Sequence, residues 1–161
     1  ELHRKFNLMR NFGHDGLNNF TGVGINGKNS EFHAAMGLVN LKYIDEVLAK
    51  RKELSVIYDG FLADISASKP LIQQGAKYNY SYYPLLFESE SQTVTVLETL
   101  KKNDIQTRRY FYPLLSKLDY VSGNPTPVAE RISRRILCLP MYHELTKEEI
   151  ATICHIIKEC S

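Results

Sequence analysis

The sequence contains no tryptophan and only three cysteines among its 161 residues. Cys138, Cys154 and Cys160 form neither a C-x-x-C redox motif nor the paired spacing of a zinc site. Their odd number also argues against a disulfide framework. We therefore expect three reduced thiols and no metal site.

An excess of charge of one sign is also lacking, because 20 Lys and Arg residues are balanced by 18 Asp and Glu residues. Proteins that bind nucleic acid or an anionic membrane usually carry a basic patch, which this balance does not favour. No apolar run approaches the ~20 residues that span a bilayer, and residues 1–12 lack the apolar core of a secretory signal. We expect a cytoplasmic protein that binds neither nucleic acid nor membrane.

Hydrophobic residues, by contrast, make up 43% of the chain, which suits one ordinary packed core. From Ser30 to about Leu62 they recur every three or four residues, as in a helix. Such a helix would be ~48 Å long at 1.5 Å per residue. It would either break near residues 50–53 or bridge two packed bodies, and we favour the bridge. The chain has no initial Met, and we expect it to be part of a longer protein.

Strand-like and helix-like segments alternate in the second half of the chain. Aromatic residues alternate over residues 78–82, β-branched and aromatic residues occupy residues 105–113, and a short apolar run begins at Cys138. These patterns predict three strands, with Pro84 at an edge or a bulge. The sequence therefore predicts an α+β fold, in which a small, mostly antiparallel sheet is covered by helices.

The helices of this half have recognisable start signals. Each signal is a capping residue followed by a polar partner or a proline at the expected distance. The signals are Ser89 with Gln92, Thr126 with Pro127, and Thr146 with Glu149.

A glycine-rich turn, GVGINGKN, directly precedes the long helix. Gly22, Gly24 and Gly27 surround Asn26, so the backbone can adopt positive φ and approach a ligand closely at a helix N-terminus. Exposed amides there would suit a phosphate group. The spacing matches neither the P-loop nor the dinucleotide fingerprint, and a plain loop is the alternative.

Two aromatic segments allow a functional and a structural interpretation. Arg108, Arg109, Tyr110 and Tyr112 could bind an anionic, ring-bearing ligand, but alternation on an edge strand would produce the same string. The segment YNYSYY could stack on nucleic-acid bases. Because no Lys or Arg cluster lies beside it, a sheet face packed by helices is favoured.

The segment GINGKNSEFHAAMGL, residues 24–38, resembles the Gly-x-Asn-x-Arg-Met-x-Glu-x-x-Ala-Ala segment of the DegT-type nucleotide-sugar aminotransferases. These are pyridoxal-phosphate enzymes of the aspartate aminotransferase fold. RNFGHDG before this segment, and IQTRRYFYP and LCLPMY after it, keep the family order. The resemblance implies that residues 1–29 end the large cofactor-binding domain, residues 30–63 form a long connecting helix, and residues 64–161 form a small C-terminal α+β domain.

The resemblance also implies roles for individual residues. Asn26 corresponds to the asparagine that reaches the pyridoxal phosphate in the neighbouring subunit, so a homodimer with shared active sites is expected. The candidate substrate contacts are Lys28, Tyr110 and Tyr112. Lys28 stands where the family has arginine, and it keeps the charge but loses the bidentate fork. Leu115 occupies the place of a histidine that many members have near the substrate.

No catalytic residue is expected within this chain, because the family's cofactor-binding lysine would lie upstream. The resemblance implies the C-terminal part of a pyridoxal-phosphate aminotransferase of polysaccharide biosynthesis. This enzyme would transfer an amino group, from glutamate by expectation, to a nucleotide-linked keto sugar. The isolated chain is expected to be inactive. A free-standing α+β binding or dimerisation module is the alternative.

Overall fold

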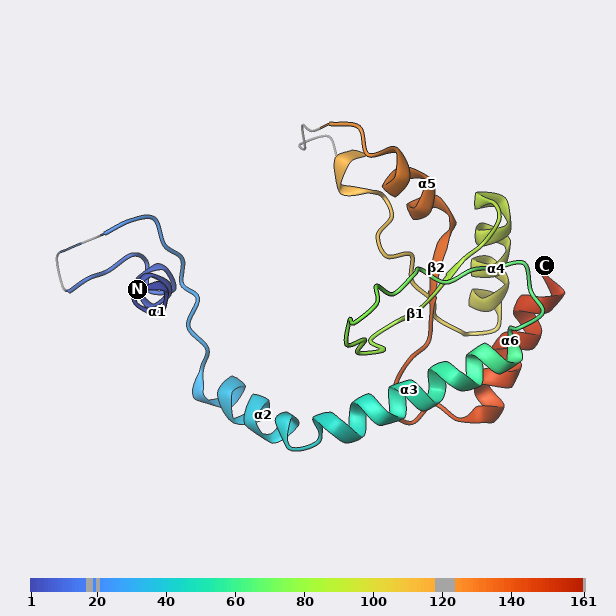
Figure 1. Cartoon of the computed structure of the whole chain (residues 1–161), viewed down its shortest axis with the longest axis horizontal. Coiled ribbons are helices and arrows are strands. Elements are labelled where there is room, and N and C mark those ends of the chain that lie inside the picture. The colour runs from blue at the N-terminus through green and yellow to red at the C-terminus, as the bar shows by residue number, and fades with distance from the viewer. Residues whose placement is uncertain (17–18, 20, 118–123, 161) are drawn as a thin grey trace. The chain divides into compact units, whose positions relative to one another are not determined.

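The computed structural model describes residues 1–16, 19, 21–117 and 124–160. The chain divides into two compact units, Glu1–Ile44 and Asp45–Ser161. Figure 1 follows their helices and strands along the chain. Among the described residues, no helix has both the length and the apolar character that crossing a bilayer requires.

The first unit contains two helices, α1 (Leu2–Met9) and α2 (Glu31–Leu41), and the loop that joins them. Ser30 caps α2, because its Oγ accepts a hydrogen bond from the His33 N–H at 3.4 Å. Neither helix has a buried residue.

The helical run predicted for residues 30–62 is present but divided. α2 ends at Leu41, and α3 (Ile44–Phe61) begins after a turn at Lys42 and Tyr43. The favoured expectation of one uninterrupted helix is therefore corrected, and the break lies at residues 42–43 and not near residues 50–53. The N–H groups of Lys42 and Tyr43 bond to carbonyls three residues back, at 3.0 and 3.1 Å, which tightens the last turn and ends the α-helical pattern.

The sheet of the second unit has two regular strands, β1 (Tyr83–Leu86) and β2 (Ile136–Leu139), which pair antiparallel. Single bridges extend it on both sides, from Ser68 to Leu86 and from Arg108 to Cys138. Pro84 lies opposite Cys138, whose N–H and C=O bond to Arg108 instead. The missing N–H of Pro84 therefore costs no hydrogen bond between β1 and β2.

The three predicted strands are shifted or shortened in the structure. Residues 78–82 precede β1 and do not form a strand. Asn79 Oδ1 accepts a hydrogen bond from the Ser81 N–H at 3.1 Å, and Tyr80 takes φ 51°, which together turn the chain. Within residues 105–113, Arg108 forms a single bridge, to Cys138, among the residues that the structure describes. The last predicted strand, β2, begins two residues earlier than Cys138.

The predicted helix starts are found as α4 (Glu90–Lys102), α5 (Pro127–Arg135) and α6 (Lys147–Glu159), and a short 3-10 helix, η1 (Leu115–Lys117), precedes α5. The capping box of α6 is complete: the Glu149 N–H donates to Thr146 Oγ1 at 3.2 Å, and the Thr146 N–H donates to Glu149 Oε2 at 2.8 Å. Ser89 caps α4, whereas the Thr126 side chain makes no capping bond.

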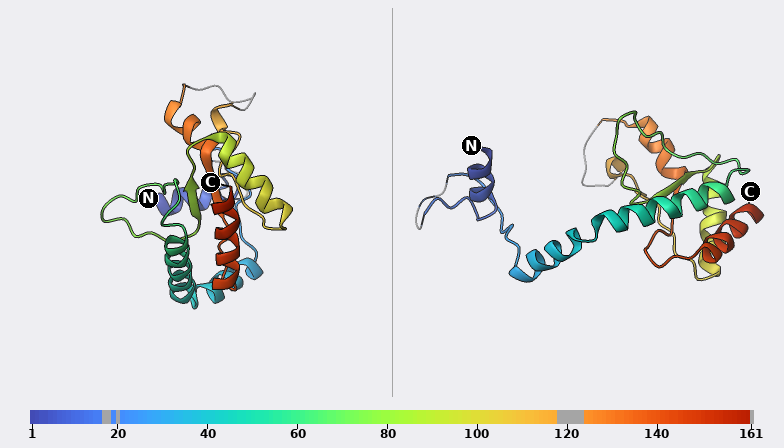
Figure 2. Two further views of the ribbon diagram at one scale, coloured as in Figure 1. Left: turned by 90° about the vertical axis from the view of Figure 1, so that its right-hand side faces the viewer. Right: turned by 60° about the horizontal axis from the view of Figure 1, so that its bottom comes forward.

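The core of the second unit is formed by α3, β1, α4, β2 and α6. Figure 2 shows α4 and α6 beside the strands. Tyr58 of α3 stacks on Tyr83 of β1 with 4.5 Å between ring centroids, and its hydroxyl donates to the Pro140 carbonyl at 3.0 Å. The predicted α+β class, with a small antiparallel sheet covered by helices, is confirmed.

Candidate functional site

The glycine-rich turn before α2 runs beside the end of α1. The N–H groups of Ile25 and Gly27 donate to the carbonyls of Met9 and Arg10, both at 2.8 Å, and Asn26 forms an antiparallel bridge with Asn11. These bonds hold the backbone on either side of Asn26. The turn is therefore braced rather than free.

The glycines of this turn serve close packing of one chain segment on another. A Cβ on Gly24 would meet the backbone nitrogen of Gly13. The expected positive φ is not found at Gly22, Gly24 or Gly27, and occurs instead at Gly13 with φ 78°. The sequence predicts that a ligand approaches the backbone closely at this turn. At Gly24 it is the backbone of Gly13 that lies this close.

The side chains of Asn26 and Lys28 differ in their surroundings. Asn26 is exposed, and its amide has no hydrogen-bond partner among the described residues. The Lys28 ammonium donates to Asn11 Oδ1 at 2.8 Å and lies 4.9 Å from the Phe12 ring centroid. The Asn26 amide thus offers donors on a braced backbone, as recognition of a phosphate group requires.

Tyr110 and Tyr112 lie in the second unit, on the segment that follows the Arg108 bridge. The Tyr110 ring packs on Tyr82 with 5.0 Å between centroids. The Arg109 guanidinium lies 3.6 Å from the centroid of Tyr112. The structure therefore places the two candidate tyrosines against different neighbours.

The two arginines of this segment also separate. Arg108 is exposed, lies 6.0 Å from the Tyr110 centroid and makes no ion pair among the described residues. Arg109 is largely buried and pairs with Glu90 at 3.2 Å. Sequence reasoning missed Glu90, because an acidic residue in the first turn of a helix is ordinary and gives no signal of a distant partner.

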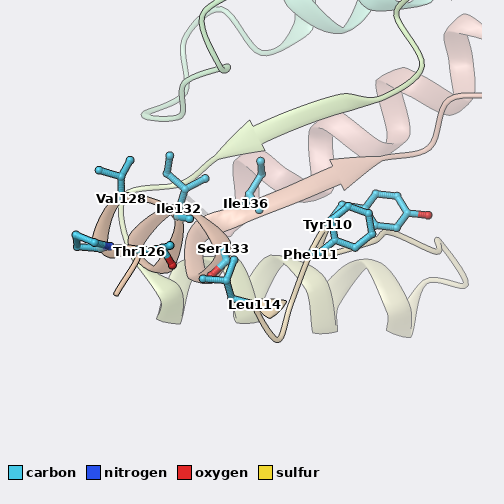
Figure 3. Close-up of a pocket in the computed structure, with 10 residues that line it drawn as sticks. Tyr110, Phe111, Leu114, Thr126, Val128, Ile132, Ser133 and Ile136 are labelled. Atoms are coloured by element: carbon cyan, nitrogen blue, oxygen red, sulfur yellow. The ribbon is translucent and has the colours of Figure 1, made fainter. Parts of the chain in front are cut away.

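An open apolar pocket lies beside Tyr110, as Figure 3 shows. It has a volume of about 670 Å³ and is lined by the segment after Arg109, by α5 and by the start of β2. Tyr110 and Phe111 lie at one end, and Val128 and Ile132 of α5 at the other. Such a pocket suits the ring of a ligand more than a charged group. Leu115 begins η1, and its side chain lies outside the described part of the structure.

The tyrosine-rich segment encloses a second pocket of about 440 Å³. Asp59 lines this pocket and accepts hydrogen bonds from Lys69 at 2.6 Å and from the Tyr83 hydroxyl at 2.7 Å. Burial and the Asp59 carboxylate both raise the pKa of Tyr83 above its ordinary value. Lys69, the lysine in the described lining, is paired with Asp59, so the arrangement does not resemble a basic nucleic-acid groove.

No group of three or more His, Cys, Asp and Glu side chains in the described ranges could hold a metal ion. The cysteines at positions 138, 154 and 160 are all free.

Comparison with known proteins gives one consistent family. The model of the DegT/DnrJ/EryC1/StrS aminotransferase family matches residues 1–158. The chain is 34% identical to a dTDP-4-amino-4,6-dideoxy-D-glucose transaminase of Escherichia coli, over 95% of this chain and 44% of that protein. A transaminase of the same name from Shigella dysenteriae is 35% identical over 99% of this chain and 45% of its own length.

Solved structures agree with this match. DesI, determined in the presence of its TDP-sugar product, superposes with a TM-score of 0.83 at 28% identity, over 96% of this chain and 41% of DesI. The putative sugar aminotransferase Spr1654 of Streptococcus pneumoniae superposes with a TM-score of 0.86 at 18% identity, over 99% of this chain and 45% of that chain, which shows the shared fold.

The chain spans less than half the length of these two curated relatives. The family model nevertheless covers almost all of the chain's own residues. The chain therefore belongs to the DegT/DnrJ/EryC1/StrS aminotransferase family.

Proposed function

We propose that this chain is the C-terminal part of a pyridoxal-phosphate aminotransferase that aminates a nucleotide-linked keto sugar. The observation that carries the proposal is the family match over residues 1–158, together with relatives that are named as transaminases of a dTDP-linked amino sugar. The domain division proposed is residues 1–29, 30–63 and 64–161. The protein would be cytoplasmic and would serve polysaccharide biosynthesis.

Asn26 is the proposed cofactor contact of this chain. Its exposed amide can donate a hydrogen bond to the phosphate of pyridoxal phosphate, while the bridge to Asn11 keeps its backbone in place. We propose that this contact is made across a homodimer, to a site whose lysine lies outside the present residues. When bound, the cofactor would supply the electron sink that amino transfer requires.

Lys28, Tyr110 and Tyr112 are the proposed substrate contacts. The Lys28 ammonium can bind an anionic group of the nucleotide sugar. In the structure it donates a hydrogen bond to Asn11 Oδ1. Tyr110 stands at the end of the apolar pocket, where a flat ring could pack against it. About half of Tyr112 is exposed, at 48%, so its side chain remains accessible to a ligand.

The test of this proposal is amino transfer by the longer protein that carries this chain and the cofactor lysine. The protein is incubated with ¹⁵N-glutamate and a dTDP-linked 4-keto-6-deoxy sugar, and the product is analysed by mass spectrometry. One ¹⁵N atom is expected in the nucleotide sugar, and no transfer is expected to the same keto sugar without its nucleotide. A nucleotide sugar that acquires no nitrogen under conditions of full cofactor occupancy would contradict the proposal.

A further inference from the structure

Arg109 connects three segments of the second unit. Its side chain is only 13% exposed. One guanidinium nitrogen, Nη2, donates to Glu90 Oε1 at 3.2 Å, at the start of α4, and to the Arg134 carbonyl at 2.8 Å, in the last turn of α5. A cation is favourable at a helix C-terminus, where carbonyls lack partners within the helix. Both bonds fix the guanidinium relative to α4 and α5.

The same guanidinium lies against Tyr112. Its central carbon is 3.6 Å from the ring centroid, which is a close stacking distance for an arginine and an aromatic ring. The backbone adds a second constraint, because the Tyr112 N–H donates to the Arg109 carbonyl at 3.1 Å. The position of the Tyr112 ring is therefore set by Arg109 through its side chain and its main chain.

Tyr112 has no other ring partner among the described contacts that could replace Arg109. The aromatic cluster beside it joins Tyr82, Tyr110 and Phe111 to one another and does not include Tyr112. Tyr112 is also absent from the described lining of the apolar pocket in Figure 3. Tyr112 lines a smaller cleft of about 130 Å³ with Glu130 and Ser133, and about half of Tyr112 is exposed. Loss of the Arg109 guanidinium would therefore remove the stacking contact on its ring and allow the ring to change rotamer.

We propose that Arg109 is a positioning residue, which holds Tyr112 in the orientation that binds the nucleotide sugar. The proposal rests on the proposed function, in which Tyr112 contacts the substrate. A side chain held in its bound orientation loses less conformational entropy when the ligand arrives. Arg109 itself touches Tyr112 and the two helix ends, and acts on the substrate only through that ring.

A double-mutant cycle tests the proposal in the longer protein. Arg109→Gln and Tyr112→Ala should each raise KM for the nucleotide sugar about tenfold and leave kcat nearly unchanged. If Arg109 acts through Tyr112, the double variant should also show about a tenfold increase. A double variant with about a hundredfold increase would mean that the two residues act independently, and would overturn the proposal.

Two further variants separate positioning from stability. Arg134→Gln removes the other guanidinium near Glu90, at 3.9 Å, but keeps the main-chain carbonyl that accepts from Arg109, and should leave KM unchanged. Arg109→Lys keeps a cation near Glu90 but lacks the planar group that stacks, so it should recover thermal stability and not KM. Arg109→Gln with lowered stability and an unchanged KM would show a structural role only and overturn the proposal.

The failure of the proposed function can be recognised separately. If the wild-type protein transfers no amino group, that function is wrong, and the ring resonances of Tyr112 in the 161-residue chain then decide the role of Arg109. With ¹³C-labelled tyrosine, these resonances should shift in Arg109→Gln and stay in place in Arg134→Gln. Unchanged resonances in both variants would overturn the positioning role.

Discussion

At the scale of single residues, Gly24 illustrates how a functional-looking glycine can have a structural cause. Ala at this position would place its Cβ against the Gly13 backbone nitrogen, whereas a Cβ on Gly22 meets nothing within 4 Å. Gly24→Ala should therefore release the bonds that hold the turn, and the Ile25 amide should exchange its hydrogen at least about tenfold faster. Gly22→Ala is the matched control and should keep the wild-type exchange rate. Equal protection in both variants would contradict the packing role.

The residue scale is also where the sequence was least informative. Arg108 and Arg109 are adjacent and chemically identical, so the pattern assigns them one shared role. Only tertiary structure separates them, because Glu90 and the end of α5 surround Arg109 and leave Arg108 exposed. Asn26 could be identified in advance because its neighbours form a recognisable segment. Its cofactor contact remains a prediction.

At the scale of helices and strands, local signals predicted helices better than strands. The capping box of Thr146 and Glu149 lies within four residues, so the sequence contains all of its parts. Strand limits depend instead on distant partners. The aromatic alternation of residues 78–82 predicts a strand there, but Asn79 turns the chain and the regular strand begins at Tyr83. The division between α2 and α3 has no glycine or proline to mark it.

The packing of α3, β1 and α6 predicts how stability depends on pH. Burial raises the pKa of Tyr58 and Tyr83 above their ordinary 10.0, and raises the pKa of Cys154 from 9.0 to about 12. Each group then keeps its proton longer in the folded state than in the unfolded state. These three groups should leave the free energy of unfolding unchanged below about pH 9 and lower it above that, by up to about 1.4 kcal/mol per pH unit for each group.

Urea unfolding between about pH 8 and about pH 11 measures this dependence. Tyr83→Phe removes one titrating group and should make the decline shallower than in the wild type, although it also removes the hydrogen bond to Asp59. A transition midpoint that stays constant over this range would show that these groups titrate alike in the folded and unfolded states.

At the scale of the whole molecule, the chain matches its family over nearly all of its own length and less than half of its relatives' length. α2 is apolar yet has no buried residue, and Phe32 is 88% exposed. A helix with this composition is usually enclosed in a larger body. This exposure supports the proposal that a longer protein completes the site to which this chain contributes.

Cofactor affinity tests most directly whether this chain contributes to a pyridoxal-phosphate site. The dissociation constant of pyridoxal phosphate is measured by fluorescence in the longer protein, for the wild type, Asn26→Ala and the matched control Asn29→Ala. Loss of one hydrogen bond to a charged phosphate should weaken binding about tenfold in Asn26→Ala. Asn29→Ala should bind as the wild type does. Equal affinity in all three proteins would contradict the assignment of Asn26 to the cofactor phosphate.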